Sequence, residues 1–255
     1  MQSRRLLQLE PAALRQPDEF TAPSHLESDG RHLPASLNRL ATRDEAARLY
    51  SQIANRLSEL IGSVRGIRID RDEKRELLTL MMTSQDGTEL PARALSDGTL
   101  RFLALSVLEL DPGTPGLICL EEPENGIHPD RIPAMLRLLQ DIATDPDGAA
   151  DETNPLRQVI VNTHSPSVVM AVPGDSVLLA KPGTDLRDRE RFTKVIFACL
   201  PGNWRNRGEA QCPEVSKGEM LGYLNPAAVI KREPTTSQRR RRVIDHPELA
   251  LFAPS

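Results

Sequence analysis

The sequence predicts an α/β fold in which a mostly parallel sheet is flanked by helices. Two apolar runs, 117–120 and 159–161, are continuous rather than alternating, which is the pattern of strands covered on both faces in a parallel sheet. Between them lies an amphipathic segment of about 131–144, and the connecting segments are polar. Strand, helix and strand in this order are typical of a right-handed βαβ unit.

Composition limits the class of protein. A chain of 255 residues is long enough for one large α/β domain or two small ones. The net charge of −4 and the pI near 5.8 do not require a polyanionic partner, and 3% aromatic residues argue against a base-stacking platform for nucleic acid. No apolar run approaches the roughly 20 residues that cross a bilayer. The N-terminus lacks the apolar centre of a signal peptide, and the three cysteines show no paired spacing, so we expect a cytoplasmic protein.

The N-terminal third divides into two parts. Residues 1–43 are rich in proline and polar residues and are expected to be an irregular lead-in. Residues 44–90 are expected to hold a helix plus strands. Thr42 and Glu45 form a capping box that predicts a helix over about 43–61. The strands of this part are expected at 66–70 and 76–82.

Residues 91–181 are expected to form the compact core lobe. Ser96 is placed to cap a helix that runs to about Leu110, and Asp130 to cap the helix of 131–144. The two strands already described follow these helices, and a further buried strand is expected at 176–180.

Residues 182–255 are expected to be a poorly structured extension. Within it, 186–200 could be a charged helix. The basic run 239–242 fits either a solvated tail or a patch that docks on an anionic partner.

Two glutamates end the first apolar strand. In an open parallel sheet, ligands bind beyond the carboxyl ends of the strands, where Glu121 and Glu122 lie. Neighbouring strand residues point to opposite faces, so the two acids cannot do the same work. One could hold Mg²⁺ while the other orients an attacking water. Taken alone, the pair equally fits a strand that simply leaves the core.

Ser96, Asp97, Gly98 and Thr99 form the second candidate element. The N-terminus of a helix offers free N–H groups and a partial positive charge, which suit a phosphate. Gly98 lets the backbone approach an anion closely, and Ser96 can donate its hydroxyl. A serine-capped helix after a turn is also commonplace without any ligand.

His164 is the third candidate, because it follows the second apolar strand. A histidine there can hydrogen-bond a terminal phosphate. A lone histidine at the end of a strand is more often structural. The three elements together, in this order on one βαβ frame, indicate a nucleotide-hydrolysing site far more specifically than any one of them.

These motifs resemble a known superfamily. Residues 94–105, Ala-Leu-Ser-Asp-Gly-Thr-Leu-Arg-Phe-Leu-Ala-Leu, resemble the signature motif of ABC-type ATPases in their SMC-like and RecF-like branch. Residues 117–122 resemble a Walker B strand. The segment 122–129, Glu-Pro-Glu-Asn-Gly-Ile-His-Pro, is similar to the extended D-loop of predicted AAA-family ATPases related to the OLD group, and 162–166 to their switch-histidine loop.

The resemblance implies a P-loop NTPase-like sheet and a role for each motif. Glu121 would lie on the Mg²⁺ side, Glu122 would be the general base and His164 would sense the γ-phosphate. ATP would be sandwiched at a dimer interface. The loop that communicates between subunits would contain Asn125 and His128. The residues that contact ATP bound to the second subunit would be Ser96, Asp97, Gly98 and Thr99.

The phosphate-cradling half of such a site is missing from the sequence. No lysine in the 255 residues belongs to a Gly-x-x-x-x-Gly-Lys-Ser/Thr loop, so the Walker A strand and loop are expected to be absent. The leading hypothesis is the carboxy-terminal part of an ATP-binding and ATP-hydrolysing ABC/SMC-like domain, with ATP and Mg²⁺ as cofactors. It would form a homodimer or take its P-loop from a partner chain; nucleic acid follows from the resemblance only. The alternatives are a non-catalytic subunit that completes a partner ATPase, and a degraded fragment with an exposed sheet edge.

Overall fold

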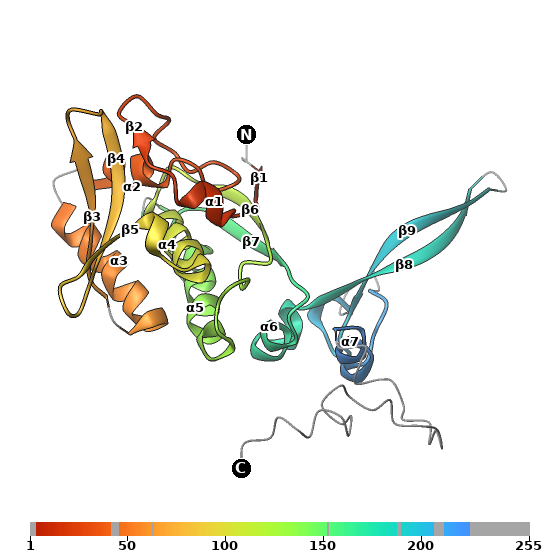
Figure 1. Ribbon diagram of the computed structural model, residues 1–255. Coiled ribbons are helices and arrows are strands. Elements are labelled where there is room, and N and C mark those ends of the chain that lie inside the picture. The colour runs from red at the N-terminus through yellow and green to blue at the C-terminus, as the bar shows by residue number, and fades with distance from the viewer. Residues whose placement is uncertain are drawn as a thin grey trace, which may run out of the picture.

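The computed structural model is a mixed α/β protein in which a parallel sheet is flanked by helices (Figure 1). A second, antiparallel sheet and a separate β-hairpin complete it. The residues that the structure describes are 4–41, 46–62, 64–151, 153–187, 190–206 and 212–224.

The parallel sheet has the strand order β1-β6-β7, with bounds Arg4–Leu7, Gly116–Glu121 and Arg157–Asn162. The two apolar runs therefore form neighbouring parallel strands, as the sequence predicted, with Leu120 paired to Val161 in register. The strand β1 was not predicted. It lies at the edge of the sheet and pairs with β6, so its identity depends on a partner more than a hundred residues later.

Only one face of this sheet is covered by helices in the described part of the chain. Ile118 and Leu120 are buried in the core beneath the helices α4 (Asp97–Leu110) and α5 (Ile132–Ile142). On the other face, Leu6 is 63% and Ile160 48% exposed. The expectation of strands covered on both faces is therefore wrong here, because alternate residues of each strand meet no packed layer.

The second sheet is antiparallel and packs on the helix α3. Its strands are β2 (Asp18–Glu19), β3 (Val64–Asp72), β4 (Leu77–Ser84) and β5 (Glu89–Pro91), with β4 paired to all the others. The predicted strands at 66–70 and 76–82 are thus confirmed. The helix α3 (Ala46–Ile61) confirms the predicted helix over 46–61, while Thr42 and Glu45 of the expected capping box lie outside the described residues.

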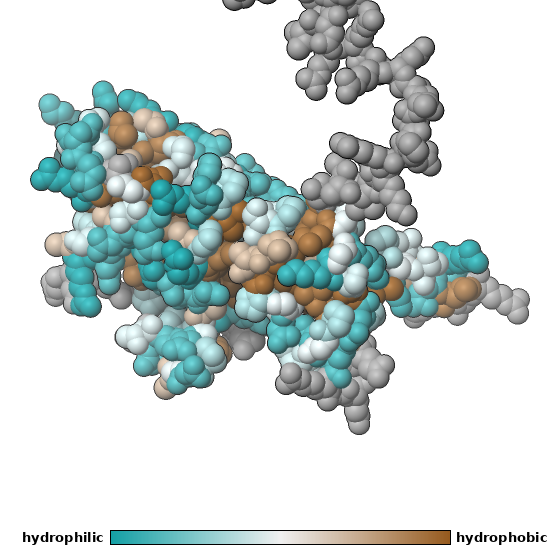
Figure 2. All heavy atoms as spheres, turned by 90° about the horizontal axis from the view of Figure 1, so that it is seen from below, coloured by the Kyte–Doolittle hydropathy of each residue, from teal (hydrophilic) through white to brown (hydrophobic). Residues whose placement is uncertain are grey.

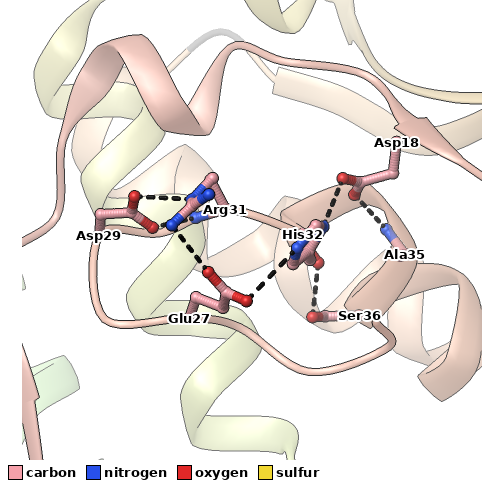
Figure 3. A network of polar contacts seen from close by, with 7 residues as sticks. All are labelled: Asp18, Glu27, Asp29, Arg31, His32, Ala35 and Ser36. Atoms are coloured by element: carbon pink, nitrogen blue, oxygen red, sulfur yellow. Dashed lines mark hydrogen bonds and ion pairs between the residues drawn. The ribbon is translucent and has the colours of Figure 1, made fainter. Parts of the chain in front are cut away.

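The expected irregular lead-in is wrong for 4–41, which holds β1, α1 (Pro11–Leu14), β2 and α2 (Leu33–Ala41). The start of α2 is fixed by a buried carboxylate from outside the helix (Figure 3). Asp18 accepts the backbone N–H of Ala35 at 2.9 Å and contacts His32 Nδ1 at 2.8 Å. On the loop before α2, Arg31 pairs with Asp29 and Glu27. The start of α2 therefore depends on Asp18, a residue from a separate strand, in addition to local ion pairs.

The helices α4 and α5 follow the predicted pattern, with one correction at the start of α5. Ser96 caps α4, and its Oγ accepts the N–H of Thr99 at 3.2 Å. Asp130 does not cap α5, because it lies in a preceding 3₁₀ turn, Pro129–Arg131, and α5 begins at Ile132 without a side-chain cap. The backbone N–H of Asp130 donates to His128 Nδ1 at 3.3 Å.

A buried arginine anchors the far end of α4. Arg157, at the start of β7, donates to the carbonyls of Glu109 at 3.0 Å and Thr114 at 3.1 Å, and also to the carbonyl of Asp111. Burial lowers the pKa of this guanidinium, while the carboxylates of Asp111 and Glu109 oppose that shift. A cation at the C-terminal end of a helix meets carbonyls that lack helical partners.

The expected strand at 176–180 is confirmed over 178–180, where β8 begins, but the possible helix at 186–200 is wrong. The chain there forms a hairpin of β8 (Leu178–Arg187) and β9 (Glu190–Cys199), which projects from the body and pairs with neither sheet (Figure 1). Hydrophobic residues lie along this ribbon in the view from below (Figure 2). Those that are exposed include Leu186, Phe192, Val195 and Phe197. The β-branched and aromatic residues of β9, Phe192, Thr193, Val195, Ile196 and Phe197, favour a strand over a helix.

A second small core supports the base of the hairpin. It contains Leu179, Ala198, Val215 and Met220, the last from α7 (Lys217–Leu224). The boundary expected after residue 181 therefore falls inside β8, and the described residues beyond it are structured rather than irregular. The basic run 239–242 lies outside the described residues. No helix in the described part of the chain has the length and apolarity needed to span a bilayer.

Candidate functional site

The N-terminus of α4 is closed on one side by the chain itself. Gly98 and Thr99 are buried, whereas Ser96 and Asp97 are exposed. A Cβ on Gly98 would lie 2.3 Å from the carbonyl oxygen of Gly126. The absence of a side chain at Gly98 therefore lets the turn after β6 pack against α4, and it leaves no open space for a ligand at this point.

Arginines hold this end of α4 against its neighbours. Arg15, immediately after α1, donates to Asp97 Oδ1 at 2.5 Å and to the carbonyl of Leu95 at 3.0 Å. Arg101, one turn into α4, donates to the carbonyl of Asn125 at 2.6 Å. The predicted signature segment and the turn 122–127 are thus joined within one chain.

The two glutamates at the end of β6 occupy different environments. Glu121 is the last residue of β6, pairs with Asn162 in register and is exposed. Glu122 is half-buried and has φ +43°, a left-handed conformation that costs a non-glycine residue about 1 kcal/mol. Its N–H donates to the carbonyl of Asn162 at 2.9 Å, and its Oε2 accepts from Asn125 Nδ2 at 2.6 Å. The turn therefore redirects the second carboxylate away from the strand.

A cleft of about 380 Å³ opens where this turn meets the end of β7. It brings together Glu122, Asn125 and His164, three residues that sequence reasoning selected. Glu121, His128 and the segment 96–99 do not line it. The residues that complete its lining are Glu124, Gly126, Ile127, Pro129, Ile132, Ser165 and Ser167.

The sequence analysis did not select two residues at this site: Glu124, which lines the cleft, and its partner Thr163, which does not. Glu124 is only 7% exposed, and its Oε1 accepts a hydrogen bond from the hydroxyl of Thr163. Its Oε2 is buried and has no partner among the described residues. The available signal was a third glutamate within four positions of the strand end, but its burial depends on the fold.

The charge of the cleft decides which ligands its residues fit. The ionisable residues of the lining are Glu122, Glu124 and the exposed His164, with no lysine or arginine among them. Carboxylate oxygens suit Mg²⁺, which is typically held by one or two carboxylates together with phosphates. The described residues hold no cluster of three or more metal-ligating side chains. The two carboxylates of the lining would repel the negative charge of a bare triphosphate.

Comparison with known proteins identifies the family. Residues 14–171, more than half of the chain, match the family described as "AAA domain, putative AbiEii toxin, Type IV TA system". No curated protein matches the chain.

Solved structures of SMC proteins are also similar, at low identity. A structure from work on ATP-driven dimerization and DNA-stimulated activation of SMC ATPases has a TM-score of 0.37 and 10% identity, and the match covers 64% of this chain and 89% of that one. For the SMC head domain from Thermotoga maritima the TM-score is 0.32 with 13% identity, and 68% and 57% are covered. For a SmcHead bound to the C-winged helix domain of ScpA the TM-score is 0.41 and the identity 15%, and the match covers 76% of this chain and 55% of that one.

These TM-scores are too low to support an argument about function, and the chain spans little more than half the length of the last two structures. The family match alone confirms the resemblance at the level of an AAA-type ATPase domain. On that match, the chain belongs to the family described as "AAA domain, putative AbiEii toxin, Type IV TA system".

Proposed function

We propose that this chain contributes the hydrolytic half of an ATPase site. The observation that supports the proposal is the cleft in which the carboxylate of Glu122, the amide of Asn125 and the ring of His164 meet at the carboxyl end of a parallel sheet. This is where open α/β sheets bind their ligands. Residues 44–90 and 91–171 would form the ATPase lobe, and the hairpin with α7 a separate appendage.

In this proposal each residue has a distinct role. Glu122 orients and deprotonates the attacking water, and Asn125 fixes one of its oxygens by the 2.6 Å hydrogen bond. His164, exposed at the cleft, hydrogen-bonds the terminal phosphate. Mg²⁺, when bound on the Glu121 side or in the cleft, would neutralise phosphate charge.

The phosphates would need a cradle that the 255 residues do not contain. Ser96 and Asp97 are exposed but lie outside the cleft, so they would contact a nucleotide held by a second subunit. In a dimer with ATP between the subunits, a second copy would add the N-terminus of its own α4 but no P-loop. A partner chain with a P-loop would supply the missing cations and amides. The likeness to SMC heads does not carry this inference; it rests on the acidic lining and the missing Gly-Lys-Ser/Thr motif.

The test is phosphate release from Mg·ATP by the full chain and by Glu122→Gln. We expect the variant to lose about 10²- to 10⁴-fold in rate, the usual contribution of a general base. Glu73→Gln is the matched control, since Glu73 is exposed on the turn between β3 and β4. Unchanged hydrolysis in Glu122→Gln would remove this residue from its role.

The acidic lining also favours a second candidate, a non-catalytic subunit that completes a partner ATPase. A titration of the full chain with Mg·ATP separates the two. Micromolar binding would favour the self-contained enzyme. Lack of binding up to millimolar ATP, with turnover restored only by a chain carrying a P-loop, would favour the subunit.

A further inference from the structure

Glu124 is a buried carboxylate that the roles above do not use. It is 7% exposed in the wall of the cleft, with its Oε2 unpartnered among the described residues. Leaving a buried polar atom unsatisfied costs about 1–3 kcal/mol. The hydrophobic effect does not favour burial of a carboxylate. The hydrogen bond that its other oxygen, Oε1, accepts therefore indicates the role of Glu124.

The partner of Oε1 is the residue immediately before His164. The hydroxyl of Thr163 donates to Glu124 and at the same time accepts the backbone N–H of Ser165 at 3.0 Å. These two bonds fix the chain on both sides of His164. The ring itself is exposed and makes no hydrogen bond in the described structure, so its position depends on this backbone.

Glu124 is itself held by the turn after β6. Its carbonyl accepts the N–H of Ile127 at 2.9 Å, and the carbonyl of Asn125 accepts from Arg101 of α4 at 2.6 Å. The same turn carries Glu122. One continuous set of contacts therefore runs from α4 through the turn to the loop of His164.

We propose that Glu124 is a positioning residue, which fixes the distance between Glu122 and His164 by holding Thr163. The proposal rests on the proposed function, in which these two side chains act on the same phosphate. Reaction rate is sensitive to such placement, since a misplacement of about 1 Å can cost about 10²-fold.

The experiment uses the full chain and four variants. Thr163→Val removes the hydroxyl at nearly constant volume, Thr163→Ser restores it, and Glu124→Met removes the acceptor. The double variant combines Thr163→Val with Glu124→Met. Thr79→Val is the matched control, at a half-buried position of β4 outside the cleft.

Two readouts are measured: kcat and KM for ATP hydrolysis, and the imidazole NMR signal of His164 without nucleotide. That signal is assigned by its loss in His164→Gln, among five histidines. We expect Thr163→Val and Glu124→Met each to lower kcat about 10- to 100-fold with little change in KM, and to shift the His164 signal. Thr163→Ser should stay near the parent protein, and the double variant should be no worse than the poorer single variant.

Either of two results would overturn the proposal. One is a His164 signal in Thr163→Val that matches that of Thr79→Val. The other is a pair of single effects that multiply in the double variant, which would mean that the residues act independently. If the parent chain hydrolyses no ATP, alone or with a chain that carries a P-loop, the proposed function fails, while the His164 signal still decides whether Glu124 positions this loop.

Discussion

Replacement of Gly98 by alanine tests the contact between α4 and the turn 122–127. On local grounds alanine should stabilise the protein, because it favours the helix by up to about 1 kcal/mol over glycine. The Cβ would, however, lie 2.3 Å from Gly126 O, 2.8 Å from Gly126 C and 3.2 Å from the N of Ile127. All three are backbone atoms, so a rotamer change cannot relieve the contact.

The distances set the size of the effect. An ordinary contact at 3.4 Å or more requires the turn to move by about 1 Å from α4. Overpacking of this kind costs about 1–3 kcal/mol, which exceeds the gain in helix propensity. After subtraction of the helix-propensity gain, the net loss is up to about 3 kcal/mol, and at about 2–4 °C per kcal/mol for a domain of this size the midpoint of thermal unfolding should fall by up to about 12 °C.

The assay is thermal unfolding followed by circular dichroism, with Gly66→Ala as the control. A Cβ on Gly66 of β3 meets nothing within 4 Å, so this variant should match the parent protein or exceed it. A Gly98→Ala protein as stable as Gly66→Ala would refute the contact. We also expect Gly98→Ala to lose ATPase activity, because the displaced turn carries Glu122.

Two further predictions concern stability. Arg157→Met should cost about 3–5 kcal/mol in urea unfolding, since it leaves three carbonyls without their donor, whereas the exposed Arg137→Met should change stability little; equal unfolding midpoints would contradict this. Burial raises the pKa of Tyr50 above 10.0, against an opposing hydrogen bond with the backbone of Ile69. The folded chain therefore keeps this phenol proton longer than the unfolded chain, and Tyr50 contributes stability that is lost as the pH rises above about 10. In Tyr223→Phe the single phenolate absorbance should appear at higher pH in the folded than in the urea-unfolded protein, and coincident titrations would disprove the shift.

The elements that the sequence predicted correctly are those specified by neighbouring residues. Ser96 caps α4 through Thr99, three positions later, and the strands β6 and β7 appear as runs of apolar residues. The elements that were missed depend on distant partners. The four residues of β1 become a strand through pairing with β6, and α2 begins where Asp18, far before it in the chain, accepts the N–H of Ala35.

The same distinction applies to the site. Glu122, Asn125 and His164 follow strands or their turns, and parallel strands bring their carboxyl ends together, so the sequence was enough to place them near one another. Glu124 was not identified, because a glutamate three positions beyond a strand is normally solvated. Its burial and its bond to Thr163 arise only when the turn after β6 folds against the end of β7.

The contact between Gly98 and Gly126 bears on whether one ATP binds within a single chain or between two subunits. If one ATP touched both the cleft and the signature segment of the same chain, it would have to pass the turn 122–127, which is closed against α4. We therefore expect Ser96 and the cleft to serve different nucleotides, one in each subunit of a dimer. Mixing Ser96→Arg chains with Glu122→Gln chains tests this. Each site of a dimer would take Glu122 from one subunit and Ser96 from the other. The mixed dimer would therefore have one site with both substitutions and one site with neither. Partial recovery of hydrolysis in the mixture, absent from either variant alone, is the expected result, and no recovery in a mixture shown to contain hetero-dimers would contradict it.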